Sequence, residues 1–264
     1  MNSQAFEISP IPALVLAAAL AGTAGWAHAQ EPAQTPAQAP ERAQAHEASV
    51  PYLTMAPAAE YLAADPNTEI ALARSAAPPA LSRDSTILVL GQHGYETAVK
   101  GTNGFVCMVE RSWMSPFESP EFWNPKIRGP VCLNPAAARS VLPFTIKRTE
   151  MAFAGVSKAQ MKVRMKQAIE SKEIPALELG AMSYMLSKDG NLGDTIGHWH
   201  PHLMFYAPKS DGADWGANLA GSPVLLDPRP QKDPEPVNTF FVPVLHWSDG
   251  SVVSERAHTH GGSN

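Results

Sequence analysis

The hexapeptide GHWHPH at residues 197–202 places three histidines at alternate positions. Alternate residues of an extended chain share a face and lie about 7 Å apart. Pro201 favours this form, because the residue before a proline is pushed toward extended conformations. Two such imidazoles and a further ligand can bind zinc, copper or nickel and leave one position for water. The spacing predicts a transition-metal site at His198, His200 and His202, which would suit metal-assisted hydrolysis.

The remaining ligand of such a site has to come from another part of the chain. His246, near the end of another predicted strand, is the first choice. His93, in a predicted turn, and Asp194, just upstream of the hexapeptide, are alternatives. His258 and His260 form a second H-x-H pair, but they lie in a tail whose metal binding would be adventitious.

Two other interpretations of the histidines compete with the metal site. In the first, the rings have a structural role. His198 and His200 would lie in a turn, and His202 would be hydrogen-bonded under a sheet beside Met204 and Tyr206. In the second, the rings line a ligand pocket and donate hydrogen bonds to its occupant. Tryptophans from several loops would then form an apolar pocket in a non-catalytic binding or interaction domain.

Other catalytic signatures are absent from the sequence. It contains no G-x-S-x-G nucleophile elbow, no S-x-x-K and no H-E-x-x-H. It also lacks a P-loop and a dinucleotide fingerprint, so we expect no nucleotide cofactor. A Ser–His–Asp triad can assemble from any chain order, so whether the protein is an enzyme stays open.

The two cysteines, Cys107 and Cys132, predict a disulfide. It would close a loop that the chain-entropy model rates at about 3.5 kcal/mol of stability. A reactive or metal-binding pair is disfavoured, because the sequence has no C-x-x-C motif and no histidine next to either cysteine. Two unpaired buried thiols are the other alternative.

The N-terminal segment has the features of a removable signal peptide at residues 1–29. An apolar stretch at residues 11–21 precedes Ala27-His28-Ala29, an A-x-A cleavage motif. The stretch is too short to cross a bilayer, which takes about 20 residues. The first ten residues are atypical because they contain no Lys or Arg. We expect a periplasmic or secreted protein without a transmembrane segment in the mature chain.

Charge and composition limit the kinds of partner that the protein is expected to bind. The net charge of −5 becomes −4 without residues 1–29, which hold one acid and no Lys or Arg. Such a chain lacks the basic surface that nucleic acids require, so we expect no nucleic-acid partner. The 25 prolines, roughly twice average usage, predict short elements. A small ligand or a metal ion fits this composition, and a protein partner stays open.

The first part of the mature chain divides into a linker and the start of a domain. Residues 30–50 are rich in Pro, Ala and Gln and predict a disordered linker. The globular domain is expected at residues 51–254, with a flexible tail at 255–264. Asp65-Pro66 predicts a helix start, and the helix should stop before Pro78. Strand-like runs at 86–90, 95–99 and 105–111, joined by short turns, predict an antiparallel β-meander.

The second part of the domain alternates loops, helices and strands. Residues 112–135, dense in proline and aromatic residues, predict an irregular packed loop. Helices are expected from Asn134 to about Leu142, ended by Pro143, and from Ser157 to Pro175. The latter has a basic face, more often solvated than functional. Further strands are expected at 179–186, 200–206, 239–247 and 251–254. The pattern predicts a single α+β domain with a largely antiparallel β-sheet.

Overall fold

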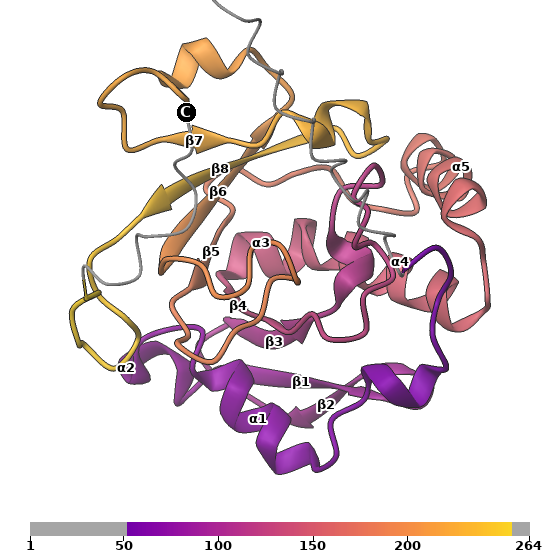
Figure 1. Cartoon of the computed structure of the whole chain (residues 1–264), viewed down its shortest axis with the longest axis horizontal. Helices are drawn as coiled ribbons and strands as arrows, with labels where there is room; N and C mark the ends of the chain where they lie inside the picture. Colours follow the sequence, from indigo (N-terminus) through magenta and orange to yellow (C-terminus); the bar gives the residue numbers. More distant parts are fainter. Residues whose placement is uncertain (1–51, 255–264) are drawn as a thin grey trace, which may run out of the picture. The chain divides into compact units, whose positions relative to one another are not determined.

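The computed structural model describes residues 52–254, which belong to one compact unit of the chain (Figure 1). The predicted signal peptide, linker and tail therefore lie outside the described residues. Over these residues the fold is α+β, with five α-helices around one eight-stranded, mostly antiparallel sheet. Between residues 52 and 254, no helix is long and apolar enough to cross a membrane.

The sheet has the strand order β2-β1-β3-β4-β5-β6-β8-β7. Its strands are β1 (Thr86–Gly91), β2 (Gly94–Val99), β3 (Val106–Glu110), β4 (Gly129–Leu133), β5 (Met182–Met185), β6 (His202–Pro208), β7 (Leu225–Leu226) and β8 (Val237–Pro243). Every neighbouring pair is antiparallel except β1 and β3.

That parallel pair corrects the predicted meander. The β1–β2 hairpin forms as expected, but β3 pairs with β1 instead of β2. The connection from β2 passes the start of β1, where the Thr102 amide donates to the Asp84 carbonyl at 2.8 Å. Gly101 allows this close passage, because a Cβ there would lie 2.2 Å from the backbone of Ser85 and Thr86. The short turn thus leads across β1 to its far side.

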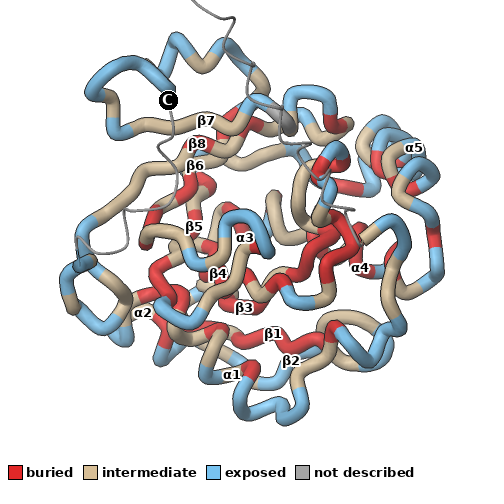
Figure 2. Tube along the Cα trace, viewed as in Figure 1, coloured by how far each residue is buried: buried red, intermediate tan, exposed pale blue. Residues whose placement is uncertain are grey.

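Helices cover both faces of the sheet. They are α1 (Pro66–Arg74), α2 (Pro79–Ser82), α3 (Pro135–Ser140), α4 (Leu142–Phe153) and α5 (Lys158–Glu170), with short 3₁₀ turns at Ala58–Tyr61, Ser112–Met114, Gly212–Trp215 and Arg229–Lys232. Because side chains alternate along a strand, Cys107 of β3 packs with Ala73 of α1, whereas Met108 packs with Ala137 of α3. The central strands are accordingly buried (Figure 2).

The helix starts follow from capping side chains. Asp65, Asn134 and Ser157 each accept a hydrogen bond from a backbone amide in the first turn of α1, α3 and α5. The sequence prediction missed α4, because it took Pro143 as a helix end. In the structure Pro143 lies in the first turn of α4, where its missing N–H has no cost.

Residues 112–128 form an irregular segment that packs into the core. The expected loop ran to residue 135, but residues 129–133 form β4, because they pair with β3, and α3 begins at Pro135. The side chains of Trp113, Phe117, Phe122 and Trp123 are all buried, at 0–4% exposure. The indole of Trp113 also donates to the Thr149 hydroxyl on α4 at 2.9 Å. These rings therefore join the segment to α4 and α5 in one apolar cluster.

The disulfide prediction is confirmed. Cys107 and Cys132 are directly opposite each other on β3 and β4 and are bonded. Both are fully buried in the cluster between the sheet and α1. The bridge thus joins the two strands that bracket the aromatic segment 112–128.

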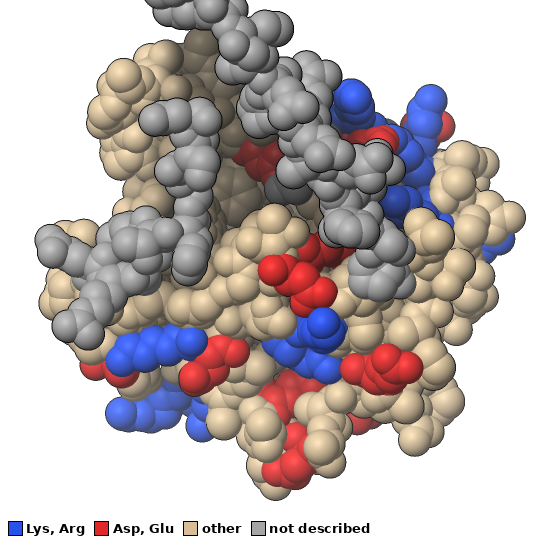
Figure 3. Space-filling view, in the orientation of Figure 1, with Lys and Arg blue, Asp and Glu red and all other residues tan. Residues whose placement is uncertain are grey.

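The basic residues of α5 line its solvent side, where Figure 3 shows blue side chains beside red ones. Met161, Met165 and Ala168 form the buried face that the helical spacing predicts. Lys162 pairs with Glu118 at 3.1 Å, and Lys166 approaches Glu170 at 3.8 Å. These pairs partly neutralise the basic side.

A buried ion pair joins α1 to the sheet. Glu69 of α1 accepts from Arg111 at 2.9 Å and from the amide of Leu90 at 3.0 Å. The Arg111 Nε donates to the Tyr61 carbonyl at 2.7 Å. Because both charged side chains are almost fully buried, removing either would leave the other buried without its opposite charge.

Glu110, the last residue of β3, faces α4 and has an unusual acidity. Burial raises the pKa of its carboxyl to about 7, against a hydrogen bond from Thr145 and the charge of Arg148, which lower the pKa. The Thr145 hydroxyl lies 3.3 Å from Oε1 of Glu110. In the folded protein this carboxyl under α4 therefore stays protonated up to about pH 7, well above its ordinary range.

We predict that Glu110→Gln flattens part of the pH dependence of stability. Because the pKa is raised, the wild type loses stability as pH rises from about 4.5, the ordinary value, to about 7. Gln cannot ionise. The free energy of unfolding of the variant, relative to that of the wild type, should therefore increase by about 2 kcal/mol between pH 5 and pH 8. Urea unfolding of both proteins at each pH measures this difference, and an unchanged difference would contradict the prediction.

Candidate functional site

The predicted histidine cluster lies on residues 186–201, the long connection between β5 and β6, and on His202 at the start of β6. Residues 186–202 are called the histidine loop below. Connections of this length inside a domain are uncommon and often functional. Of the three histidines, only His202 belongs to a strand. The predicted strand over 200–206 was therefore wrong at its first two residues, and His200 does not share a strand with His202.

A turn before the histidines explains this correction. Gly197 has φ of +61°, a left-handed conformation that glycine adopts without steric cost. Its amide donates to the Gly193 carbonyl and its carbonyl accepts from the Leu192 amide, both at 2.7 Å. The chain is therefore folded back at Gly197, so His198 leaves a turn rather than an extended strand.

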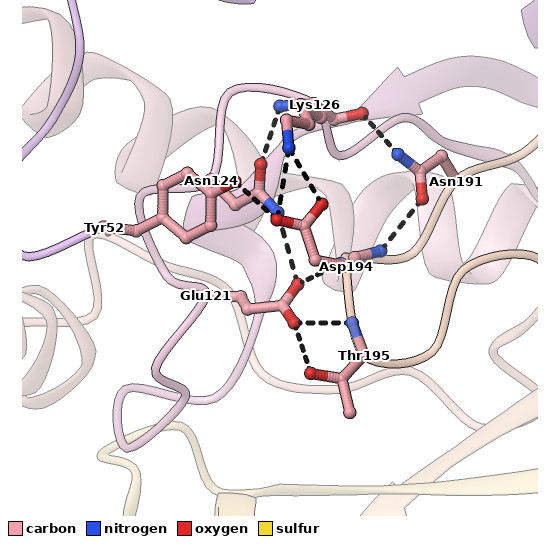
Figure 4. Close-up of polar contacts among 8 residues, drawn as sticks. Tyr52, Glu121, Asn124, Lys126, Asn191, Asp194 and Thr195 are labelled. Carbon is pink, nitrogen blue, oxygen red and sulfur yellow. Dashed lines mark hydrogen bonds and ion pairs between the residues drawn. The ribbon is translucent and has the colours of Figure 1, made fainter. Parts of the chain in front are cut away.

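The carboxylate of Glu121 holds the turn of the histidine loop (Figure 4). One oxygen accepts from the Thr195 amide at 2.9 Å and from its hydroxyl at 2.7 Å. The other accepts from the Asp194 amide at 2.8 Å and from the Asn124 side chain at 3.3 Å. Burial acts to raise the pKa of Glu121, but these hydrogen bonds outweigh it and lower the pKa. The ionised carboxylate is thus the form that holds the loop.

Asp194 and Asn191 add further contacts to the same segment (Figure 4). The Asp194 carboxylate accepts from the Tyr52 hydroxyl at 2.6 Å and from Lys126 at 3.2 Å. Asn191 forms a two-way backbone bridge with Arg128, and its side chain donates to the Lys126 carbonyl at 3.1 Å. Asp194 was an alternative metal ligand in the sequence analysis. In the structure its carboxylate forms an ion pair with Lys126 instead.

Two of the histidines have one ring nitrogen fixed by the backbone. Nδ1 of His198 lies 3.0 Å from the Gly190 carbonyl, and Nδ1 of His202 lies 2.7 Å from the His200 carbonyl. Since a carbonyl oxygen only accepts, each Nδ1 carries the proton. In the neutral ring, Nε2 then holds the lone pair and acts as an acceptor.

The surroundings of these two rings differ. His198 is exposed and stacks on Trp247, with 4.8 Å between ring centroids. His202 is 2% exposed and lies against Trp199 and Phe241, at 4.5 and 5.7 Å. Burial lowers the pKa of His202 to about 4, against the His200 carbonyl, which raises it. His202 is therefore neutral at ordinary pH.

All three histidines line one small cavity of about 20 Å³, enough for roughly one water. Its walls are Pro130, Met185, Ser187, Gly190, Leu192, His198, Trp199, His200 and His202. None of these described wall residues carries a fixed charge. The structure thus brings the three predicted ligands to one cavity.

The fourth predicted metal ligand, His246, is not among these wall residues. It lies after β8 and pairs with Val252 in an isolated antiparallel bridge, so the strand expected at 251–254 is reduced to that one bridge residue. His93, in the β1–β2 turn, is also outside the wall, and His258 and His260 are outside the described residues. Over residues 52–254, no group of three His, Cys, Asp or Glu side chains is arranged to hold a metal ion.

The loop tryptophans do not gather into a single ligand pocket. Trp113 and Trp123 belong to the core, and Trp215 stacks on Phe240 at 4.3 Å near the β7 edge. Trp199 alone among them lines the cavity, and Trp247 reaches it indirectly through His198.

Glu121 was not singled out in the sequence. Nothing local distinguishes it from neighbouring acids, since its partners in the histidine loop are more than 70 residues away. Gly193 is the complementary feature, with φ of +133° and a position where a Cβ would lie 1.9 Å from Glu121 Oε2. A glycine there is therefore required for the carboxylate to approach.

Comparisons with protein-family models, with curated proteins and with solved structures found no match to this chain.

We predict that Glu121→Ala loosens the histidine loop. The Asp194 and Thr195 amides would lose a charged acceptor, a contribution of about 1.5–3 kcal/mol. Their hydrogen exchange, followed by NMR, should accelerate at least tenfold. Glu118→Ala is the matched control, because Glu118 pairs with Lys162 on the surface. Equal exchange at these amides in both variants would show that Glu121 does not hold the loop.

Proposed function

We propose that this chain is an exported, non-catalytic binding domain that accepts part of a small uncharged ligand in the histidine cavity. The observation that carries the proposal is the pair of Nδ1–carbonyl contacts at His198 and His202. They leave Nε2 as the acceptor nitrogen of two rings that line one cavity. The ligand would therefore receive no hydrogen bond from Nδ1–H, and would instead donate to the rings.

The walls of the cavity favour an uncharged ligand. No Lys, Arg, Asp or Glu is among the described wall residues, and His202 is neutral because its pKa is about 4. A charged group would lose its hydration without an opposite charge nearby, which is costly. An uncharged donor that hydrogen-bonds to a ring nitrogen has a much smaller cost.

The fixation of the loop supports a binding role. Glu121, Asp194 and Asn191 connect the loop to the segment before β4 through charged and backbone hydrogen bonds. A loop fixed before its ligand arrives loses less entropy on binding. The disulfide is compatible with an oxidising compartment, where the predicted signal peptide would direct the chain.

A transition-metal site is the second candidate. A hydrogen bond from Nδ1 to a carbonyl is the usual arrangement that orients a histidine ligand, and both His198 and His202 have it. These two rings would bind zinc or copper through Nε2, with water completing the coordination. This role ranks second because the residues described include no group of three suitable ligands.

We predict that uncharged fragments bind at the histidine loop. The ¹⁵N-labelled protein would be titrated with a panel of small uncharged fragments, half of them bearing hydroxyl groups. Chemical-shift changes of the amides should concentrate at residues 187–202. The fragments should bind at least fivefold more weakly to His198→Ala. His246→Ala is the control, since His246 lies outside the described cavity wall. Shifts spread over the surface, or none, would refute a binding role for the cavity.

The metal alternative is tested in the same proteins. Equimolar Zn²⁺ or Cu²⁺ should raise the melting temperature of the wild type and leave that of His198→Ala unchanged if two imidazoles bind the ion. Elemental analysis of the purified protein gives the stoichiometry. No bound metal and no thermal shift would exclude this candidate.

A further inference from the structure

The size of the histidine cavity limits what enters it. A volume of about 20 Å³ accommodates one group of the size of a water molecule. Small-molecule pockets that enclose a whole ligand are at least an order of magnitude larger, roughly 300–1,000 Å³. The cavity therefore takes a single protruding group, and the rest of the ligand lies on the surface around it.

Hydrogen bonding further limits which chemical group of a ligand can enter the cavity. Nε2 of His198 and His202 is an acceptor, so a group that hydrogen-bonds to either of these nitrogens has to donate. An ammonium donates but is charged, and the described wall offers no carboxylate to balance it. An amide N–H is uncharged but carries a substituent on either side of nitrogen. A hydroxyl is uncharged, donates one hydrogen bond and is a single heavy atom.

The aromatic rings beside the cavity suit an apolar ring face next to that hydroxyl. Trp199 forms part of the wall, and Trp247 lies against His198. Both tryptophans are only half-buried, so part of each indole remains accessible. An indole packs well against the apolar side of a flat or ring-shaped group. The ligand thus combines a hydroxyl with an adjacent apolar ring face.

We infer that the histidine loop binds a neutral saccharide, with one hydroxyl donating into the cavity and the C–H face of the sugar ring against the adjacent indole. This inference rests on the proposed binding function and names its ligand class. A saccharide meets each requirement together, because it is uncharged, rich in hydroxyl donors and apolar on the faces of its ring.

The test compares sugars with derivatives that cannot donate. Methyl glucoside, methyl galactoside and methyl N-acetylglucosaminide would be titrated into the ¹⁵N-labelled protein, each beside its fully O-methylated form. At least one free sugar should shift the amides of residues 187–202 and the indole resonance of Trp199. Its O-methylated form should bind at least fivefold more weakly, as expected from the loss of a neutral hydrogen bond.

Two variants locate the contact. His198→Ala should weaken the sugar about fivefold, whereas His246→Ala should bind like the wild type. Should fragments without hydroxyl groups shift residues 187–202 as strongly as any sugar, the saccharide inference falls and the binding function stands. The saccharide inference also falls, with the binding function intact, if O-methylated sugars bind as well as free ones. An absence of shifts with every sugar and every fragment overturns both.

Discussion

The carboxylate of Glu121 is the contact on which the geometry of the histidine loop depends. It accepts four hydrogen bonds, three from the loop and one from Asn124 on its own segment. Neighbouring Phe122 and Trp123 are buried in the main core. Because Glu121 directly precedes these buried residues in the chain, the core positions the carboxylate and, through it, the loop. Ionised acceptors of this kind form stronger hydrogen bonds than neutral ones.

The sheet also positions the histidine loop, by holding its two ends. β5 and β6 pair in register, which places Met185 opposite His202 and fixes both ends of the loop. β4 connects them to β3, to which it is joined by five register pairs and by the disulfide. The buried Glu69–Arg111 pair attaches α1 to the same strands. The cavity wall therefore combines side chains from β4, β5, β6 and the loop, all on one rigid framework.

Local signals predicted what depends on local interactions. The caps at Asp65, Asn134 and Ser157 and the strand-like run of β1 were readable because each involves neighbouring residues. The parallel β1–β3 pair and α4 were not, since a short turn and Pro143 each permit two outcomes. At the site, the sequence identified the three histidines that line the cavity. It could not anticipate Glu121, whose partners are distant, nor the reversal at Gly197.

The chemistry of the histidines follows from two backbone carbonyls rather than from the H-x-H spacing. The spacing alone leaves either ring nitrogen available, so it suits a metal, a donor or an acceptor equally. The carbonyls of Gly190 and His200 each accept from an Nδ1, which leaves Nε2 as the acceptor. Metal binding and hydroxyl binding both use that lone pair, and they differ in what else surrounds it. A metal requires further ligands, whereas a hydroxyl requires only a neutral, narrow wall, which the described residues of this cavity provide.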